Sequence, residues 1–212
     1  MADASNPNAD QPKFESLQGI VSPPTLKALT QNPFKLTHMS PVQAAVLPLL
    51  PQLLEPSGPD LMVKARTGTG KTLAFLIPAV EARLKDLEAH AETVTKELMT
   101  SNRSAIRRAV AQRARETVGA LIISPTRELA TQIANEAIKL TRHQDGMEVR
   151  LFTGGLSKRA QMREWNSYRR DIVVATPGRL RDCIENEPGF EEALKTANTV
   201  RVDLSYLLAP DS

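Results

Sequence analysis

Residues 61–72 read LMVKARTGTGKT, and this segment constrains how the rest of the chain is arranged. The apolar run 61–65 precedes a loop that contains Gly68 and Gly70. The apolar residues from Leu73 to Leu87 then recur every three or four positions, which predicts a helix. Glycines between a strand and a helix let several backbone N–H groups converge on one anion, and the helix N-terminus adds positive potential. The segment therefore predicts a strand, a phosphate-binding loop and a helix.

The loop also carries the side chains that a nucleoside triphosphate requires. Its pattern is GxxxxGK[ST] with Ala65 at the first glycine position. We expect Lys71 to bind the β- and γ-phosphates and the Thr72 hydroxyl to be a Mg²⁺ ligand. A simple glycine turn with an exposed lysine is the alternative, which the flanking strand and helix disfavour. The predicted cofactor-binding residues of the loop are Ala65, Arg66, Thr67, Gly68, Thr69, Gly70, Lys71 and Thr72.

Three further apolar runs, 120–124, 149–153 and 171–175, are each followed by a segment with helical spacing. Nearly continuous apolar strands that alternate with helices are typical of a parallel sheet covered on both faces. Upstream, Ser40-Pro41 predicts the start of a helix that Pro48 and Pro51 bend or end. The fold class is therefore α/β.

Residues 85–116 interrupt this alternation. Leu87 to Leu98 keep the helical spacing, SNRS at 101–104 offers a break with a new cap, and a second helix follows with five arginines. The segment is predicted to be an inserted helical hairpin. Its basic face is either solvated only or an auxiliary surface that contacts phosphates, and the sequence leaves both interpretations open.

Composition restricts the class of protein. The 212 residues are 41% hydrophobic and 24% charged with a net charge of +3, which is ordinary for a globular protein and permits a nucleic-acid partner without requiring one. The longest apolar runs fall short of the roughly 18 residues that a membrane span needs, so we expect no membrane contact. The single cysteine, Cys183, cannot form an internal disulfide, which favours an intracellular location. Residues 1–12 are predicted to be a disordered tail.

Hydroxyls, glycines and arginines follow the three later strands. Because carboxyl ends of parallel strands meet at the same edge of a sheet, where open α/β sheets bind ligands, these residues should lie together. Each motif alone is an ordinary turn, whereas together they suit contacts to a sugar–phosphate backbone. The predicted contact residues are Pro125, Thr126, Arg127, Gly154, Gly155, Thr176, Pro177, Gly178 and Arg179.

With these motifs the chain resembles the first RecA-like domain of DEAD-box ATP-dependent RNA helicases. ARTGTGKT is similar to their motif I, PTRELA to motif Ia, TGG to the GG element and TPGR to motif Ib. Phe34 and HMSPVQ, ending in Gln43, resemble the Q motif, whose glutamine amide reads the adenine edge. Phe14 resembles the upstream aromatic that stacks on adenine. LTHMSPVQ leans toward the fungal mitochondrial branch.

The resemblance implies ATP-driven local unwinding of RNA duplexes. ATP and Mg²⁺ would be held by Gln43 and the phosphate loop, with Lys71 as the catalytic residue. RNA would be held through its backbone, without base readout. The implied organisation is a tail (1–12), a Q-motif region (13–60), a partial RecA-like ATP-binding domain (61–198, with a helical insertion at about 85–116) and a divergent C-terminal tail (199–212). A mitochondrial location is also implied, although the N-terminus does not have the composition of a presequence.

The sequence departs from the family after TPGR. The expected strand ends in Asp203, which Leu204-Ser205-Tyr206 follows in place of Glu-Ala-Asp, so we assign Asp203 no catalytic role. The Ser-Ala-Thr element and a second RecA-like domain are likewise not found in the 212 residues. Three functions stay open: an RNA helicase of which this is a fragment or altered version, a non-catalytic ATP- or RNA-binding module, and a phosphate-loop enzyme of another class. PTRELA and TPGR disfavour the third.

Overall fold

The computed structural model describes residues 10–55, 57–66, 68–99, 102–197 and 199–202, the last of these by their backbone only. The chain divides into two compact units, which are treated separately below. The first comprises residues 1–81 and 136–145, and the second comprises residues 82–135 and 146–212. Two long helices, α4 (Lys71–Glu97) and α6 (Arg127–Leu140), contribute residues to both units.

The first unit contains several short helices. They are η1 (Phe14–Leu17), α1 (Pro23–Thr30), α2 (Pro41–Val46), η2 (Leu47–Leu49) and α3 (Leu50–Leu53), followed by the start of α4. Ser40 caps α2 with a capping box, and Pro41 occupies its first turn, as predicted. The regular α-helix gives way at Leu47, next to Pro48, because a proline inside a helix removes a backbone donor.

A buried carboxylate joins the first unit's helices. Glu81, on α4, is 7% exposed and accepts hydrogen bonds from the Ser22 backbone N–H at 3.0 Å, the Ser22 hydroxyl at 2.9 Å and the Thr25 hydroxyl at 2.6 Å. The Gln144 amide donates to both of these hydroxyls, at 3.1 and 3.0 Å. Three donors on α1 and its cap thus satisfy one carboxylate, as a buried polar group requires.

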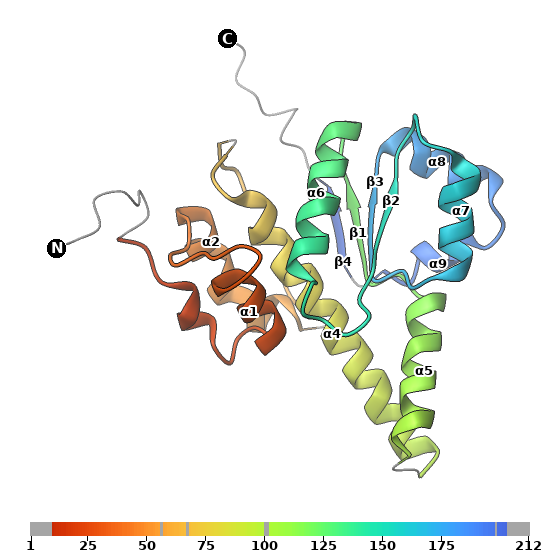
Figure 1. Cartoon of the computed structure of the whole chain (residues 1–212), viewed down its shortest axis with the longest axis horizontal. Helices are drawn as coiled ribbons and strands as arrows, with labels where there is room; N and C mark the ends of the chain where they lie inside the picture. Colours follow the sequence, from red (N-terminus) through yellow and green to blue (C-terminus); the bar gives the residue numbers. More distant parts are fainter. Residues whose placement is uncertain (1–9, 56, 67, 100–101, 198, 203–212) are drawn as a thin grey trace. The chain divides into compact units, whose positions relative to one another are not determined.

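The second unit is built on a four-stranded parallel sheet with the order β2-β3-β1-β4 (Figure 1). The strands are β1 (Ala120–Ile123), β2 (Val149–Phe152), β3 (Ile172–Ala175) and β4 (Thr199–Val202). Three of them match the predicted runs. The fourth lies where the sequence suggested a strand within the divergent C-terminal tail, and it pairs with β1 as the last strand at that end of the described sheet.

Aromatic and aliphatic side chains cover one face of this sheet. Phe152 of β2 contacts Trp165 of α7 (Lys158–Ser167) and Phe190 of α9 (Phe190–Leu194), with ring centroids 5.5 and 5.2 Å apart. Leu180 and Cys183 of α8 (Pro177–Asn186) belong to the same core, and the three helices lie together beside β2 and β3 (Figure 1). Alternate strand residues on the opposite face are also fully buried: Ala120, Ile122, Ile172 and Val174. The parallel sheet is therefore covered on both faces, as the apolar runs predicted.

A buried ionic network lies where β1 and β3 begin. Arg83 of α4 is fully buried, and its Nε donates to Asp171 Oδ1 at 2.8 Å, while its Nη1 donates to Asp86 at 2.9 Å. Asp171 is also fully buried and accepts from Arg169 and from the Glu148 backbone N–H. A Cβ on Gly119 would lie 2.4 Å from the Arg83 side chain, so only glycine fits there. The network therefore fixes α4 against the amino ends of two strands.

The predicted strand at 61–65 is wrong. Residues 61–66 are described and adopt no regular secondary structure; Met62 is 94% exposed. These residues belong to the first unit, whereas all four described strands belong to the second. An apolar run predicts burial locally, but a strand also needs a neighbour to complete its hydrogen-bond ladder, and 61–66 has none among the described residues.

The insertion is a helical hairpin, as predicted. Its first arm is the continuation of α4, which runs without interruption from Lys71 to Glu97, and its second arm is α5 (Arg103–Glu116). The Asn102 side chain caps α5 by accepting hydrogen bonds from the backbone N–H groups of Ser104 and Ala105. The cap therefore falls within the SNRS segment.

Candidate functional site

The phosphate loop leads directly into α4. Gly68 and Gly70 have positive φ angles of 76° and 83°, which glycine adopts without the steric cost of a Cβ. Lys71 is the first residue of α4, and its ammonium donates to two carbonyl oxygens of the loop, Ala65 at 2.7 Å and Arg66 at 2.5 Å. The Thr69 hydroxyl donates to the Arg66 oxygen at 2.7 Å. The loop thus curls around its own lysine; Thr67 lies outside the described residues.

Gln43 connects the Q-motif region to this loop. Its side-chain Nε2 donates to the Gly70 carbonyl at 3.0 Å, and its Oε1 accepts from the Ser40 backbone N–H at 2.8 Å. Gln43 is 4% exposed. A primary amide has two N–H donors and an oxygen that accepts twice, so one donor and one acceptor position remain for a ligand. Gln43 thus lies beside the predicted nucleotide-binding loop, while its contact with adenine stays a prediction.

The loop fits the phosphates of ATP in its chemistry. A Cβ on Gly70 would lie 2.6 Å from Gln43 Nε2 and 2.9 Å from Ser40 Oγ. The loop backbone can therefore approach the Gln43 side chain this closely only if residue 70 is glycine. The Lys71 ammonium would exchange two neutral carbonyl oxygens for charged phosphate oxygens, which form stronger hydrogen bonds. Thr72, in the first turn of α4, has no hydrogen-bond partner among the described residues, so its hydroxyl is available as a Mg²⁺ ligand. These residues would hold Mg-ATP, which supplies the phosphoanhydride bond.

Phe14 does not occupy the position expected for a ring that stacks on adenine. It is fully buried, and its backbone N–H donates to the Thr37 carbonyl at 3.0 Å. Its ring is therefore part of the first unit's core and presents no face to a ligand. Phe34 is half-buried in the loop that follows α1, so part of its ring stays accessible.

The second unit brings two of the predicted backbone-contact motifs together. Arg127 begins α6, directly after β1, and Gly154 and Gly155 follow β2. A Cβ on Gly155 would lie 2.8 Å from Arg127 Nη1, and one on Gly154 would lie 3.2 Å from Arg127 Nη2. The guanidinium therefore packs on the backbone of the glycine turn. The arginine is otherwise exposed, so its remaining N–H groups are open to solvent.

The third motif lies at the same edge. The Thr176 backbone N–H donates to the Phe152 carbonyl at 2.9 Å, which ties the end of β3 to the end of β2. Pro177 and Gly178 are exposed in the first turn of α8, and a Cβ on Gly178 would meet nothing within 4 Å. Pro125 and Thr126 link β1 to α6, where the Thr126 hydroxyl accepts from the Leu129 N–H at 3.2 Å. The predicted contact residues thus converge at the carboxyl edge, as parallel topology requires.

Arg179 differs from Arg127 because the protein itself binds its guanidinium. Arg179 Nη1 donates to Gln161 Oε1 on α7, and Nη2 donates to the Leu156 carbonyl at 3.1 Å. Gln161 Nε2 in turn donates to the Thr153 carbonyl at 3.2 Å. Arg179 and Gln161 therefore fix the 153–156 turn from two sides. The sequence analysis did not identify Gln161, because it belongs to none of the recognised motifs. Its position eight residues after Thr153 is the one sequence feature that relates it to the turn.

A model of the DEAD/DEAH box helicase family matches residues 40–203 of this chain. The chain belongs to that family. It is 37% identical over 186 residues to DEAD-box ATP-dependent RNA helicase 25 of Oryza sativa subsp. japonica, covering 88% of this chain and 27% of the relative. It is 36% identical over 183 residues to DEAD-box ATP-dependent RNA helicase 31 of Arabidopsis thaliana, covering 86% of this chain and 22% of that relative. The chain thus spans about a quarter of these curated relatives' length.

Solved DEAD-box structures share the fold. The yeast DEAD-box splicing factor Prp28 superposes with a TM-score of 0.65 at 27% identity, over 90% of this chain and 38% of Prp28. The DEAD-box helicase Mss116, in a structure bound to ssRNA and UDP-BeF, superposes with a TM-score of 0.65 at 24% identity, over 91% of this chain and 41% of Mss116. The predicted RecA-like α/β class with its parallel sheet is therefore confirmed.

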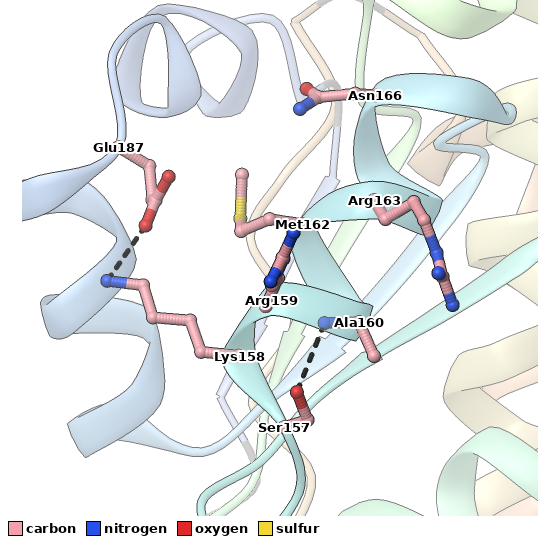
Figure 2. Close-up of a pocket in the computed structure, with 8 residues that line it drawn as sticks. All are labelled: Ser157, Lys158, Arg159, Ala160, Met162, Arg163, Asn166 and Glu187. Carbon is pink, nitrogen blue, oxygen red and sulfur yellow. Dashed lines mark hydrogen bonds and ion pairs between the residues drawn. The ribbon is translucent and has the colours of Figure 1, made fainter.

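A surface groove of about 800 Å³ lies along α7 of this DEAD/DEAH box helicase domain (Figure 2). Lys158 donates to Asp182 Oδ1 at 2.9 Å and to Glu187 Oε1 at 3.0 Å, and these hydrogen bonds raise the pKa of Lys158. The hydrogen bond from Lys158 lowers the pKa of Asp182. Arg159 and Arg163 belong to the groove wall on α7. The groove wall therefore contains one ion-paired lysine, Lys158, and two exposed arginines, Arg159 and Arg163, close in sequence to the glycine turn.

Two further statements hold for the described residues. No helix among them is long and apolar enough to cross a membrane. Their His, Cys, Asp and Glu side chains form no group of three that could hold a metal ion.

Proposed function

We propose that this chain is the ATP- and RNA-binding N-terminal RecA-like domain of an ATP-dependent RNA helicase of the DEAD-box type. The observation that carries the proposal is the convergence of Arg127, the Gly154–Gly155 turn and Thr176 at one sheet edge. An arginine with free N–H groups beside exposed glycine backbone suits phosphates and sugars rather than base edges. The relatives named as RNA helicases, and Mss116 bound to ssRNA, support the same partner.

The nucleotide is proposed to be ATP with Mg²⁺. Gln43 lies against Gly70 and keeps one donor and one acceptor free, which suits the N6 and N7 positions of adenine. Lys71 would bind the β- and γ-phosphates and act in catalysis, and Thr72 would be the protein's Mg²⁺ ligand. An intracellular location is part of the proposal, because the single cysteine, Cys183, is a buried free thiol.

A second candidate is a non-catalytic module that binds ATP or RNA. It is favoured by the sequence at 203–206, Asp-Leu-Ser-Tyr, which replaces the Asp-Glu-Ala-Asp that organises Mg²⁺ and the attacking water in the family. Binding would require only the residues described above. Hydrolysis would require a carboxylate that positions water.

The test uses the purified chain with a fluorescent ATP analogue and a fluorescein-labelled single-stranded RNA. Lys71→Ala should weaken nucleotide binding about 10- to 100-fold, since a charge-assisted hydrogen bond contributes about 1.5–3 kcal/mol. Arg127→Ala should weaken RNA binding about tenfold, while Arg142→Ala, an exposed arginine elsewhere, should leave it unchanged. If wild-type protein bound neither ligand, the proposal would fail.

RNA-stimulated phosphate release separates the two candidates. Release that Lys71→Ala abolishes supports the helicase. Nucleotide and RNA binding without release above background supports the non-catalytic module.

A further inference from the structure

The net positive charge of the chain is concentrated in α5. The helix contains five arginines and one glutamate, which give it a net charge of +4, whereas the whole chain carries +3. The rest of the chain therefore has a net charge of −1. Only Arg103 and Arg107 lie one turn apart, and Arg113 and Arg115 in the last turn interact favourably with the helix dipole, so the charge is compatible with a stable α5.

One of the five arginines has a structural role. Arg113 donates to Asp86 of α4 through Nη2 at 2.6 Å and Nε at 3.3 Å, and Asp86 also binds the buried Arg83. The Thr117 hydroxyl, just after α5, accepts from Arg83 Nη1 at 3.1 Å. Through these contacts α5 is joined to α4 and to the ionic network at Asp171. These contacts hold the C-terminal end of α5 against α4.

Three other arginines point into solvent. Arg103, Arg108 and Arg115 are exposed and have no hydrogen bond or ion pair with any residue that the structure describes. Arg108 and Arg115 are seven residues apart, so they lie on one side of the helix, at about 140–160° from Arg113. From Arg103 to Arg115 the axial distance is about 18 Å. Arg103 lies about 120–140° around the helix axis from the other two, so the three side chains spread around the exposed part of α5 and do not form one stripe. Together, Arg103, Arg108 and Arg115 are called the α5 arginine surface below.

This surface lies at the opposite end of the sheet from the residues assigned to RNA. Residues 117–119 connect α5 to the amino end of β1, whereas Arg127, Gly154 and Thr176 follow the carboxyl ends of strands (Figure 1). Four strand residues separate the two ends by about 13 Å. Nucleotides bound at the carboxyl edge therefore cannot also contact α5. A nucleic acid on α5 would therefore lie beyond the nucleotides bound at the carboxyl edge.

We propose that the α5 arginine surface binds phosphates of an RNA segment that flanks the strand held at the carboxyl edge. The inference rests on the proposed function, since it assumes an RNA strand at that edge. Guanidinium groups match phosphate oxygens in geometry and charge. The helix contains no aromatic side chain for base stacking, so the contact is with the backbone and is independent of sequence. Two contacts on one RNA raise the apparent affinity through effective concentration.

An acidic membrane surface is the other polyanion to consider. Interfacial helices bury a face of large apolar residues between the lipid headgroups. The large apolar residues of α5 are Ile106 and Val110, and both are partly buried in the protein. The helix therefore supplies the charge for a membrane but not the apolar face, which favours RNA.

The experiment compares two RNAs by fluorescence anisotropy across a salt series. One is a single strand that is too short to extend beyond the carboxyl edge. The other is the same strand joined to a hairpin duplex. The test variant is R103Q/R108Q/R115Q. The matched control, K27Q/K139Q/R142Q, removes the same charge from exposed positions outside α5, and R103K/R108K/R115K keeps the charge. Circular dichroism and thermal unfolding of each variant check that it folds.

On the hairpin RNA, the glutamine variant should reduce the slope of log Kobs against log salt by about 2–3, because each of the three lost phosphate contacts removes roughly 0.7–0.9 from the slope. The lysine variant and the matched control should keep the wild-type slope. On the short strand, all variants should bind like wild type. The inference is overturned if the glutamine variant matches the control on the hairpin RNA, or if it weakens both RNAs equally.

Two further outcomes separate the sources of failure. In the first, wild-type protein binds phosphatidylserine vesicles and the glutamine variant does not, while both have equal salt slopes on the hairpin RNA. That result would assign α5 to a membrane and overturn the inference. Failure of the proposed function has a different signature, because Arg127→Ala would then leave binding of the short strand unchanged. The readout of the α5 arginine surface does not depend on ATP hydrolysis.

Discussion

The phosphate loop of the first unit and the loops at the sheet edge of the second unit all lead into helices, yet only the sheet-edge loops follow paired strands. At the sheet edge, three loops follow paired strands, so the parallel ladder fixes where Arg127, the glycine turn and Thr176 lie. In the first unit, residues 61–66 form no strand, and the lysine of the loop binds the loop's own carbonyl groups. A motif therefore specifies the chemistry of a site, while the neighbouring strand specifies its geometry.

The two units also differ in how they bury charge. In the second unit, Arg83 and Asp171 form a fully buried ion pair. In the first unit, the Glu81 carboxylate is satisfied by hydroxyls and a backbone N–H, with no cation among its hydrogen-bond donors in the described residues. Removing one member of each network should therefore have unequal effects.

The largest effect is expected from Arg83→Met, which leaves Asp171 buried without its Arg83 partner. Removing one partner of a buried pair costs about 3–5 kcal/mol of unfolding free energy. Arg181→Met is the matched control, because Arg181 is 79% exposed in its pair with Glu185 and such pairs contribute about 0–1 kcal/mol. Urea denaturation followed by circular dichroism measures both. Equal stability of the two variants would show that the buried pair contributes nothing net.

A smaller effect is expected from Glu81→Gln. The amide keeps one acceptor oxygen but places an N–H₂ group against the Ser22 and Thr25 donors, so at least one buried donor loses its partner. The cost should be about 1–3 kcal/mol. Hydrogen exchange should rise in α1, and Glu88→Gln, at an exposed position of the same helix, should leave it unchanged. Unchanged protection of α1 in the Glu81 variant would contradict the assigned role.

Gly70→Ala and Gly68→Ala form a matched pair. Both glycines have positive φ, so alanine at either position costs about 1–2 kcal/mol of backbone strain. Only at Gly70 would the new Cβ also contact Gln43 Nε2, at 2.6 Å, whereas at Gly68 it would meet nothing within 4 Å. Nucleotide affinity should therefore fall further for Gly70→Ala. Equal affinities for the two variants would show that the approach of Gln43 to the loop is unimportant for binding.

The smallest effect concerns Asp182 beside the α7 groove. The Lys158 hydrogen bond lowers the pKa of Asp182, so the folded state favours the carboxylate. The resulting stabilisation is complete above the ordinary aspartate pKa and is lost as the pH falls through the lower, folded-state pKa. Thermal unfolding of wild type and Asp182→Asn should differ slightly at neutral pH and converge in acid. A difference that persists in acid would assign the effect to something other than ionisation.

Sequence patterns were sufficient for features whose cause is local. The Ser40 capping box and the Asn102 cap depend on residues within three positions, and the runs that became β1, β2 and β3 carry their own burial signal. The convergence of Arg127 with the glycine turn also followed, because parallel topology brings carboxyl ends together. These are the parts of the fold and site that the sequence could predict.

Features that depend on distant partners could not be predicted in this way. Arg83 and Asp171 are 88 positions apart, and nothing near either residue indicates the pair. The run at 61–65 has the composition of a strand but no ladder among the described residues. Arg179 has the type and position of a phosphate ligand, yet Gln161 and Leu156 bind its guanidinium. In each case the partner, rather than the residue itself, determines the outcome.

Trp165 gives the molecule a built-in optical reporter. It is the one tryptophan in the chain and is 2% exposed. The Phe190 ring centroid lies 4.4 Å from its own, and the Arg170 guanidinium lies 4.1 Å from its ring centroid. All three residues belong to the second unit. Intrinsic fluorescence excited at the indole therefore reports melting of the sheet alone, while ellipticity reports both units. A difference between the midpoint temperatures of the two transitions would measure how independently the two units unfold.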